Sequence, residues 1–431
     1  MKKIVKNGRV LDPSQSLDLQ KAHVEIINGC IEKIHTSDDI LKQQFDEIID
    51  AQDLVVAPGF IDMHVHLRDP GQTYKEDLHS GSMAAVSGGF TSVLCMPNTS
   101  PTNDSVNTTK YILDKARSIG LCKIYPVGAL TCGLLGKELV DFEALYEAGC
   151  IAFSDDGRPC VDTALFRRAM EIASKLNVLV IEHCEDAFLT QGRTTIHDGE
   201  IAKKLGFQGI NSASETRDVS RSIVLASETG AKLHLAHMSC AESLEMIRAV
   251  KNKFDHISCE VSPHHLTLTV EAVERLGTFA KMYPPLRTQK DIEALQLALK
   301  DRLIDVVATD HAPHSDEEKQ KPFSQAPNGV IGLQSALPVM LTLVNMKRLT
   351  LQAVIEAMSV RPAELLGLKA GSLKKGYPAD LVVFSTETEQ DLGKIKQWSK
   401  SNNTPFSHFM GRGYVEHTLL DGKSVYARGD Q

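Results

Sequence analysis

The residues best suited to chemistry in this chain are two histidines, His64 and His66, which stand two positions apart within an otherwise apolar run. On a β-strand, alternate side chains lie on one face about 6–7 Å apart, so both imidazoles can reach one metal ion. The same alternation predicts that Arg68 lies on that face as well. Because buried neutral imidazoles need polar partners, the pattern favours a metal and anion site over a merely polar sheet face.

The composition is that of an ordinary globular protein, with 42% hydrophobic and 24% charged residues in a chain of 431. This length allows a barrel-sized domain and a smaller one. A net charge of −8 and the lack of a basic run argue against nucleic-acid or anionic-membrane partners. No run is apolar enough for a membrane span or a secretory signal, so we expect a cytoplasmic protein. The nine cysteines form no CxxC pair, which favours reduced thiols over disulfides.

From residue 58 onward, apolar strand-like segments alternate with helical ones. The eight predicted strands cover residues 60–67, 91–97, 123–130, 151–154, 178–183, 232–237, 257–261 and 305–309. Near-continuous apolar runs are typical of parallel strands that are covered on both faces. The pattern therefore predicts an α/β fold with a (β/α)8 barrel similar to that of triosephosphate isomerase (a TIM-like barrel) over residues 58–364.

Both ends of the chain have a different pattern, with short strands and turns. Asn-Gly pairs at residues 7–8 and 28–29 separate apolar runs, which predicts two tight hairpins. Strand-like segments return after residue 365. We therefore expect residues 1–57 and 365–431 to form one smaller composite β-sandwich domain.

The ends of the predicted barrel strands carry most of the residues that could bind a metal or an anion. Active sites of such barrels lie at these carboxyl ends, where loops can enclose a ligand. Taken singly, each residue could be a core histidine or a turn aspartate, but their common position favours a site. They are His64, His66 and Arg68 on the first strand, Asn98 after the second, Asp155 and Asp156 after the fourth, His183 at the fifth, His237 at the sixth, and Asp310, His311 and His314 after the eighth.

The number of candidate ligands exceeds what one tetrahedral zinc ion needs, so a two-metal site is predicted. Two divalent ions need a bridging anion, which could be an Asp, a carbamylated Lys or a hydroxide. No Lys lies at the ends of the third or fourth strand, whereas Asp156 does. We therefore assign Asp156 as the bridge, with Asp155 as the weaker alternative.

Two longer motifs resemble those of the class I dihydroorotases of the amidohydrolase superfamily. They are residues 62–77 (Asp-Met-His-Val-His-Leu-Arg-Asp-Pro-Gly-Gln-Thr-Tyr-Lys-Glu-Asp) and residues 308–314 (Ala-Thr-Asp-His-Ala-Pro-His). Shorter matches extend the resemblance over nearly the whole chain, at residues 96–99, 153–157, 183–186, 284–287 and 376–380. The pair of long motifs is specific, whereas His-x-His alone marks only the superfamily.

The resemblance implies a zinc-dependent cyclic amide hydrolase with two Zn²⁺ ions per subunit. Its reaction would be the reversible cyclisation of N-carbamoyl-L-aspartate to L-dihydroorotate in de novo pyrimidine biosynthesis. The implied ligands are His64, His66, Asp156 and Asp310 for one metal, and Asp156, His183 and His237 for the other. Asp310 would also carry the proton of the reaction.

The resemblance further implies which residues bind the substrate. Arg68, Asn98 and His314 would hold its carboxylate, and the backbone at Asn328 and Gly329 would meet the pyrimidine ring. A guanidinium suits bidentate binding of a carboxylate. Two positions depart from the family pattern: Tyr283 stands where Asn is expected, and Asn328 stands where an aromatic residue is common.

Two other classes of function share part of this pattern. A hydantoinase or allantoinase would have the same metals but usually employs a carbamylated Lys and lacks the Leu-Arg-Asp-Pro-Gly sequence after His-x-His, so Arg68 discriminates. A non-catalytic homologue that supports aspartate transcarbamoylase would be expected to have lost ligands, and here each expected ligand is present.

The partners that we expect follow from this prediction. The main one is a small-molecule substrate, and a homodimer and an association with aspartate transcarbamoylase are both compatible with the sequence. The hydrophilic residues 314–329, directly after the eighth strand, are expected to form a mobile lid over the site.

Overall fold

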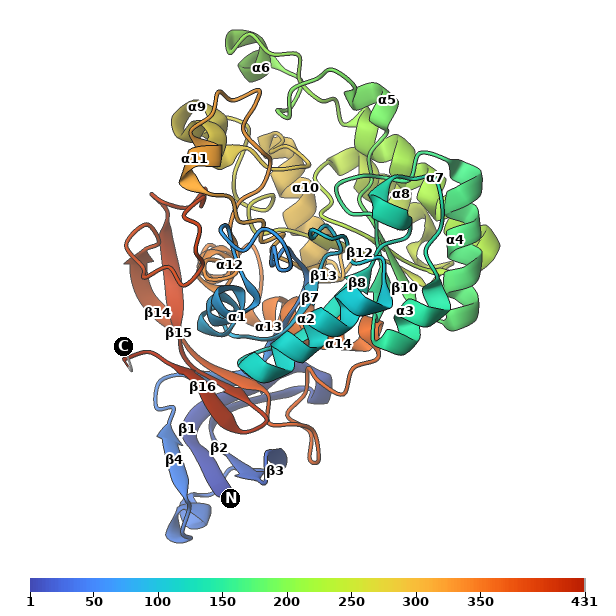
Figure 1. Ribbon diagram of the computed structural model, residues 1–431. Coiled ribbons are helices and arrows are strands. Elements are labelled where there is room, and N and C mark those ends of the chain that lie inside the picture. The colour runs from blue at the N-terminus through green and yellow to red at the C-terminus, as the bar shows by residue number, and fades with distance from the viewer. Residues whose placement is uncertain (430–431) are drawn as a thin grey trace.

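The centre of the protein is a sheet of eight parallel strands, paired in chain order from β6 to β13 (Figure 1). The computed structural model describes residues 1–429. The strands are β6 (Phe60–Val65), β7 (Phe90–Cys95), β8 (Lys123–Gly128), β9 (Ala152–Phe153), β10 (Leu179–Glu182), β11 (Lys232–Leu235), β12 (Ile257–Val261) and β13 (Val306–Val307). The sheet closes where Val65 pairs with His311 and the His66 N–H donates to the His311 carbonyl over 2.8 Å. The predicted (β/α)8 barrel is thus confirmed.

Helices surround these strands, and Figure 1 shows α2, α3 and α4 on the outside of the barrel. Those up to the eighth strand are α1 (Leu78–Ser87), α2 (Val106–Ile119), α3 (Phe142–Ala148), α4 (Thr163–Leu176), α5 (Ala187–Thr190), α6 (Glu200–Lys204), α7 (Ala213–Thr229), α8 (Ala241–Lys251), α9 (Ala272–Leu276) and α10 (Gln289–Lys300). Those after it are α11 (Asp316–Lys319), α12 (Ala336–Asn345), α13 (Leu351–Ile355) and α14 (Arg361–Leu366).

Helix α4 illustrates why these segments are helical. The Asp162 carboxylate accepts hydrogen bonds from the first backbone N–H groups, and the helix ends at Asn177 in the left-handed conformation. Between these ends the buried residues recur at helical spacing, on the face that packs inward. They are Phe166, Ala169, Met170 and Ala173.

All eight predicted barrel strands are present, but several end earlier than predicted. Strand β10 ends one residue before His183, and β11 ends two residues before His237. Both histidines thus lie just beyond the ladder, and His237 has a φ of 34°. The residues just beyond the carboxyl ends of the strands are therefore not held by strand pairing, so their backbone can adopt other conformations.

A second sheet contains strands from both chain ends, as predicted. Its order is β16-β15-β14-β5-β1-β2-β3, with β4 paired to β1. The strands are β1 (Lys2–Asp12), β2 (Leu17–Ile27), β3 (Cys30–His35), β4 (Glu47–Asp50), β5 (Val55–Pro58), β14 (Leu381–Asp391), β15 (Met410–Leu420) and β16 (Lys423–Ala427). The two ends join where β14 runs antiparallel to β5. The predicted domain boundaries, after residues 57 and 364, fall inside β5 and α14 and remain predictions.

One of the two predicted hairpins is wrong. Asn28 and Gly29 form the tight turn between β2 and β3, and both have positive φ. Asn7 and Gly8, in contrast, lie inside the continuous strand β1, where the register shifts on both sides of Gly8. A residue with positive φ, such as Asn7, occurs in β-bulges as well as in turns. Because the long strand β2 pairs with β1 on both sides of this position, the two residues form a bulge.

The barrel is filled by apolar side chains below the site. One buried cluster includes Met63, Leu94, Val127 and Ile181, each from a different strand. Such close packing makes the barrel a rigid scaffold rather than a pore. All nine cysteines of the chain have free thiols. Among residues 1–429, no helix is both long and apolar enough to cross a membrane.

Candidate metal centre

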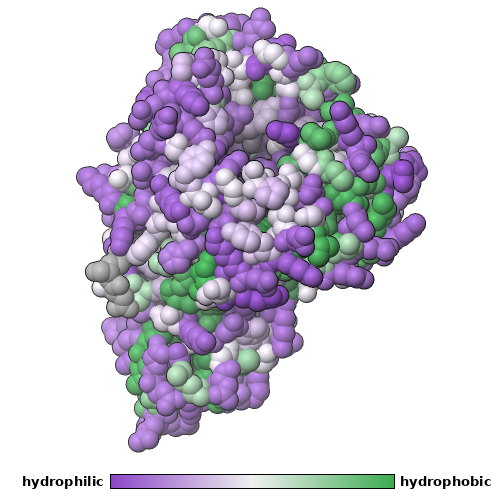
Figure 2. Space-filling model, viewed as in Figure 1, coloured by the Kyte–Doolittle hydropathy of each residue, from purple (hydrophilic) through white to green (hydrophobic). Residues whose placement is uncertain are grey.

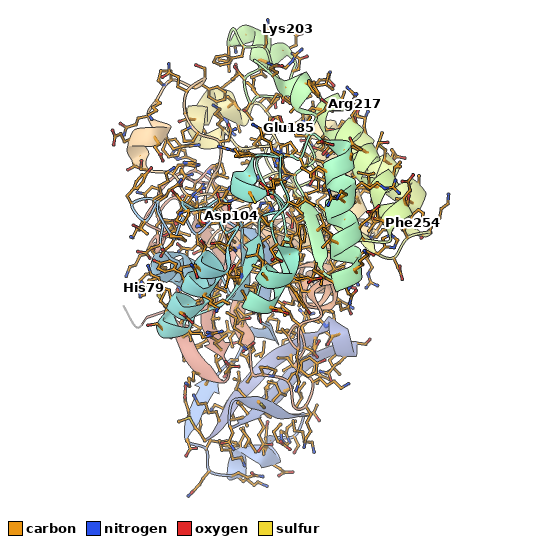
Figure 3. All side chains as sticks on the ribbon, turned by 45° about the vertical axis from the view of Figure 1, so that its right-hand side comes forward. His79, Asp104, Glu185, Lys203, Arg217 and Phe254 are labelled. Carbon is orange, nitrogen blue, oxygen red and sulfur yellow. The ribbon has the colours of Figure 1, made fainter. Side chains whose placement is uncertain are left out.

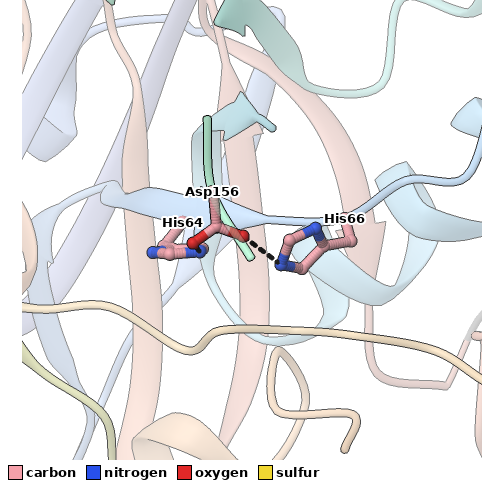
Figure 4. Close-up of side chains that lie close together, drawn as sticks. All are labelled: His64, His66 and Asp156. Atoms are coloured by element: carbon pink, nitrogen blue, oxygen red, sulfur yellow. Dashed lines mark ion pairs between the residues drawn. The ribbon is translucent and has the colours of Figure 1, made fainter. Parts of the chain in front are cut away.

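Asp156 lies at the centre of a cluster of four histidines at the carboxyl ends of the strands. Figure 4 shows its carboxylate between His64 and His66, whose Nε2 atoms lie 3.3 and 3.5 Å from its two oxygens. On the other side, His183 Nδ1 and His237 Nε2 each lie 3.6 Å from Asp156 Oδ1. All five side chains are buried. One carboxylate is thus shared by two pairs of imidazoles.

This arrangement fits two metal ions that share a carboxylate. The atoms of His64, His66 and Asp156 lie within 4.8 Å of one another, as do those of Asp156, His183 and His237. His64 Nε2 and Asp156 Oδ1 are buried and have no hydrogen-bond partner among the described residues. Because unpaired buried polar atoms are costly, these two atoms indicate a missing ligand. Imidazole and carboxylate donors suit zinc and related divalent ions.

The charges in the cluster also favour cations. Burial by itself would lower the pKa of His64, yet Asp156 and Glu260 raise that pKa well above its usual value. Burial would raise the pKa of Asp156, but the positive charge of His64 and the nearby rings of His183 and His237 bring it well below its usual range. The acids therefore stabilise positive charge here, and a divalent ion can supply that charge.

Asp155, the alternative bridge, points away from the cluster. Its carboxylate accepts from the N–H groups of Leu130 and Thr131 at 2.8 and 3.0 Å and from the Thr131 hydroxyl. These bonds occupy both of its oxygens and anchor the loop after β8. The geometry therefore favours Asp156 over Asp155 as the bridging ligand.

Asp310 lies next to the first pair of histidines. Its Oδ1 is 3.2 Å from His66 Nε2 and 3.8 Å from His64 Nε2. Burial opposes its ionisation, but the hydrogen bond to His66 and the charge of His64 lower the pKa of Asp310 to about 2. The carboxylate is therefore ionised at neutral pH and can act both as a ligand and as a proton acceptor.

Three residues of this region have strained backbones. Arg68, His237 and Asp310 have φ values of 59°, 34° and 47°, in the left-handed region that non-glycine residues rarely adopt. Such strain persists only where the surrounding structure enforces it, and it clusters at functional sites. Each of the three follows the end of a barrel strand, so the strain aims their side chains toward the site.

Polar side chains outside the cluster orient its histidines. Glu260 Oε1 lies 2.8 Å from His64 Nδ1, and Asn98 Oδ1 lies 2.8 Å from His66 Nδ1. In both rings this contact leaves Nε2 free to face Asp156. Glu185 Oε2 lies 3.5 Å from His183 Nε2. In Figure 3, Glu185 lies below the tip of α6, which Lys203 marks.

Sequence reasoning missed Glu260 and Glu185. Glu260 is an acid inside the otherwise uncharged strand β12, and a buried carboxylate on such a strand is a signal that could have been used. It also accepts from His234 Nε2 at 3.0 Å. Its two imidazole partners come from other strands, so its role depends on pairings that one strand does not reveal.

We predict that Glu260→Gln weakens metal binding roughly 10- to 100-fold, the usual effect of removing an outer carboxylate from a ligating histidine. The amide keeps the volume but cannot fix both His64 and His234 in one tautomer. Metal affinity is measured by competition with a chelator. Ser258→Ala is a matched control because its hydroxyl contacts the other nitrogen of His234, at 2.8 Å, and the Leu233 carbonyl, at 3.3 Å, but not His64. Equal affinities for Glu260→Gln and the unmodified protein contradict the prediction.

A buried guanidinium, which could bind an anion, lies beside the histidine cluster. The Arg68 guanidinium is buried, donates to the Pro313 carbonyl over 3.2 Å and lies 3.2 Å from His314 Nε2. Burial, together with the positive charges of Arg68 and Lys75, lowers the pKa of His314 to about 2, so this histidine is neutral. A neutral imidazole beside a guanidinium can donate or accept without adding charge.

The sequence argument for Arg68 was wrong in one respect. Strand β6 ends at Val65, so strand alternation does not reach residue 68. The left-handed backbone of Arg68 redirects the chain, and its side chain meets His314 instead of continuing a strand face. The predicted neighbourhood is nevertheless present, because the loops after β6 and β13 lie side by side.

One cavity of about 420 Å³ joins these groups. The predicted site residues that line it are His66, Arg68, Asn98, Asp156, His183, His237, Tyr283, Asp310, His314, Asn328 and Gly329. Of the residues that the family resemblance implies, only His64 is absent from this lining, and it is fully buried at 0% exposure. Asp155 and His311, which the strand-end pattern also predicted, do not line the cavity. The surface is hollowed in its upper half, between the regions of α5 and α9 (Figure 2). The structure thus brings the predicted residues together, whereas their individual roles remain to be tested.

Tyr283 forms part of the cavity wall. Its ring centroid lies 5.1 Å from that of His183. Burial, and then the charge of Glu185, raise the pKa of its hydroxyl above the usual value, so the side chain is neutral. An aromatic ring at this position covers His183, a candidate metal ligand, and forms part of the cavity wall.

A (β/α)8 barrel with histidines and aspartates at its strand ends defines a metal-dependent hydrolase of the amidohydrolase type. The model of the amidohydrolase family matches residues 181–426, and the model described as dihydro-orotase-like matches residues 53–243. The chain is 46% identical to the dihydroorotase of Aquifex aeolicus over 99% of both chains, and 45% identical to that of Geotalea daltonii over 98% of this chain and 99% of the relative. The chain belongs to the dihydroorotase family.

Solved structures of other cyclic amidases share the fold. The L-hydantoinase from Arthrobacter aurescens superposes with a TM-score of 0.87 at 24% identity, over 99% of this chain and 96% of that one. A D-hydantoinase from Thermus sp. gives a TM-score of 0.83 at 25% identity, over 99% and 97%. Likeness at this identity supports the barrel and the second β unit, and the family assignment rests on the closer sequence relatives.

Proposed function

We propose that this chain catalyses the reversible cyclisation of N-carbamoyl-L-aspartate to L-dihydroorotate with two zinc ions. The observation that carries the proposal is the shared carboxylate of Asp156, between two pairs of histidines, with the buried guanidinium of Arg68 in the same cavity. A metal cofactor is implied by the family, and zinc is our choice because the donors are imidazoles and carboxylates.

The residues fall into two ligand sets. His64, His66, Asp156 and Asp310 would hold one ion, and Asp156, His183 and His237 the other. When bound, the two ions supply Lewis-acid activation of water and of the ring amide carbonyl. The protein contributes the orientation of the donors, since Glu260 and Asn98 fix the rings of His64 and His66.

We assign substrate binding to the part of the cavity around the positively charged Arg68. The Arg68 guanidinium would hold the carboxylate of the substrate, assisted by neutral His314 and by the amide of Asn98. Because the Asn98 oxygen already accepts from His66, only its NH₂ group is available to the substrate. This assigns Asn98 two tasks, one toward the ligand His66 and one toward the substrate.

Proton transfer would be the task of Asp310. Its carboxylate is ionised at neutral pH, so it can accept a proton from the attacking water and deliver it to the leaving ring nitrogen. In the synthetic direction Asp310 would accept the proton from the carbamoyl nitrogen and give it to the departing hydroxide, which leaves as water. No other carboxylate that lines the cavity is free for this task, because Asp156 is shared by both ligand sets.

The proposal is tested by metal removal and reconstitution. We expect chelated protein to regain turnover of N-carbamoyl-L-aspartate when zinc alone is added, in bicarbonate-free buffer, with two zinc ions per chain. Bicarbonate is not needed because Asp156 already provides the carboxylate that a lysine would acquire from carbon dioxide. Recovery only when bicarbonate accompanies zinc would overturn the bridge assignment, and metal-loaded protein that does not turn over either substrate would refute the function.

We predict that Tyr283→Asn changes KM for dihydroorotate by no more than about 2- to 13-fold, the value of one hydrogen bond of 0.5–1.5 kcal/mol. Tyr283 contacts a ligand ring but holds no metal, so zinc content should not change. Steady-state kinetics in both directions measure the effect. A gain of orders of magnitude in kcat/KM would mean that the natural protein is adapted to another cyclic amide.

The buried Arg68 separates this function from that of a hydantoinase. Because a hydantoin ring carries no carboxylate at the matching position, an uncompensated guanidinium would disfavour its binding. The homodimer and the association with aspartate transcarbamoylase remain predictions from the sequence.

A further inference from the structure

Lys319, the last residue of α11, has a fully buried ammonium group that pairs with no carboxylate among residues 1–429. The residue is 1% exposed, and its Nζ donates to three backbone carbonyls: those of Lys281 at 3.3 Å, Pro327 at 3.1 Å and Gly329 at 2.8 Å. An ammonium group has three donors, so all of them are used. Burial lowers the pKa of Lys319 to about 7. Lysines are almost never fully buried unless their ammonium group is paired, and here three backbone carbonyls are the partners.

Lys281, on the segment before Tyr283, repeats the arrangement. Its Nζ donates to the carbonyls of Phe323 and Ala326, each at 2.6 Å, and burial lowers its pKa to about 8. Its own carbonyl accepts from the N–H of Gly329 over 2.9 Å as well as from Lys319. Within residues 1–429, neither ammonium group donates to a carboxylate. The two lysines therefore hold the backbone of residues 323–329 from both ends.

This backbone forms one wall of the substrate cavity. Pro327, Asn328 and Gly329 line it together with the histidines around Asp156. A Cβ on Gly329 would lie 2.7 Å from the Ala312 Cβ, and its φ is +124°, so only glycine allows so close an approach. Asn403 fixes the same stretch, since its Nδ2 donates to the Ala312 and Gly329 carbonyls at 3.0 Å each.

The N-terminal part of the segment is tied down by a separate network. Glu318 Oε1 lies 2.8 Å from Lys75 Nζ, and Glu318 Oε2 lies 3.3 Å from His314 Nδ1. The Ser315 hydroxyl also accepts from the Glu318 N–H, which caps α11. These contacts, with those of the two lysines, argue for a fixed strap rather than the mobile lid that the sequence predicts.

We propose that Lys319 and Lys281 are positioning residues that hold the backbone of residues 323–329 as a fixed wall against the ring of the substrate. Neither lysine lines the cavity, so both act through the carbonyls that they bind. The identity of the ring substrate, dihydroorotate, rests on the proposed function. Because a misplacement of about 1 Å can reduce rates by about 10²-fold, loss of either anchor is expected to lower kcat/KM by roughly 10- to 100-fold.

The test is Lys319→Met in the zinc-loaded enzyme, with KM and kcat for dihydroorotate, zinc content and thermal unfolding measured together. We expect KM to carry most of the loss while two zinc ions stay bound. Lys321→Met, an exposed lysine two residues away, is the matched control and should leave every value unchanged. An unchanged KM in Lys319→Met, or a loss that follows zinc content, would overturn the proposal.

A second variant separates positioning from general stability. In Lys319→Ala, ethylammonium can occupy the vacated space and donate to the same carbonyls, so it should restore KM toward the original value. Tetramethylammonium has no N–H group and should not. If the two cations act equally, the lysine does not work through its hydrogen bonds.

Hydrogen exchange on the unmodified protein tests whether residues 323–329 form a fixed wall, even if Lys319→Met and Lys319→Ala fail to fold. The amide of Gly329, which donates to Lys281, should exchange far more slowly than an open loop. Exchange at the rate of a free loop would overturn the fixed wall. This measurement needs no turnover, so its outcome is distinguishable from a failure of the proposed function, which wild-type kinetics would reveal.

Discussion

Asp156→Asn is expected to lose both metal ions and all measurable turnover together. Its carboxylate is the only group shared by the two metal-ligand sets, lying 3.3 to 3.6 Å from ring nitrogens of His64, His66, His183 and His237. An amide keeps the shape but loses the negative charge that balances two divalent ions. Metal affinity should fall by more than the roughly 10- to 100-fold lost when an outer hydrogen bond to a ligand is removed.

The measurement is zinc content by elemental analysis, beside turnover of both substrates and a thermal unfolding scan. Asp155→Asn is the control, because Asp155 is equally buried but binds Leu130 and Thr131. It should lower the unfolding temperature and leave the zinc content of the folded protein unchanged. If Asp155→Asn loses the metals while Asp156→Asn retains them, the assignment of the bridge is reversed.

Asp310→Asn is expected to retain most of its metal and to lose turnover by roughly 10²-fold or more, the usual effect of removing a positioned proton carrier. The amide oxygen can still face His66, but the side chain can no longer accept a proton. The loss should appear in kcat for both directions of the reaction, since the same group would transfer the proton each way.

Zinc content must accompany the rate, because Asp310 is also a predicted ligand. Rates are therefore compared per bound zinc ion, over a range of zinc concentrations. Asn98→Ala removes the partner of His66 but leaves the proton carrier Asp310 in place. It is expected to bind metal more weakly and to lose less rate than Asp310→Asn at saturating zinc. A near-normal kcat for Asp310→Asn at full occupancy would exclude Asp310 from proton transfer.

Much of the site could be predicted because the barrel converts sequence position into spatial position. Every parallel strand ends at the same edge, so His183 and His237 could be placed near His64 without knowledge of any contact. Strand ends were less predictable: the ladder stops at Val65, and the turn at Arg68 depends on a left-handed backbone. Similarly, Asn7 and Gly8 have the chemistry of a turn, and only the long partner strand β2 makes them a bulge.

By itself, the sequence determined the fold class, the family and most of the side chains that meet around Asp156, because periodic apolar segments and strand-end histidines are local signals. Tertiary structure decided which of two adjacent aspartates faces the histidines, since that depends on the loop after β8, whose N–H groups bind Asp155. It also decided the roles of Glu260 and Lys319. Each is an ordinary charged residue in the sequence, and each acquires its role only because folding removes water and leaves distant imidazoles or carbonyls as its partners.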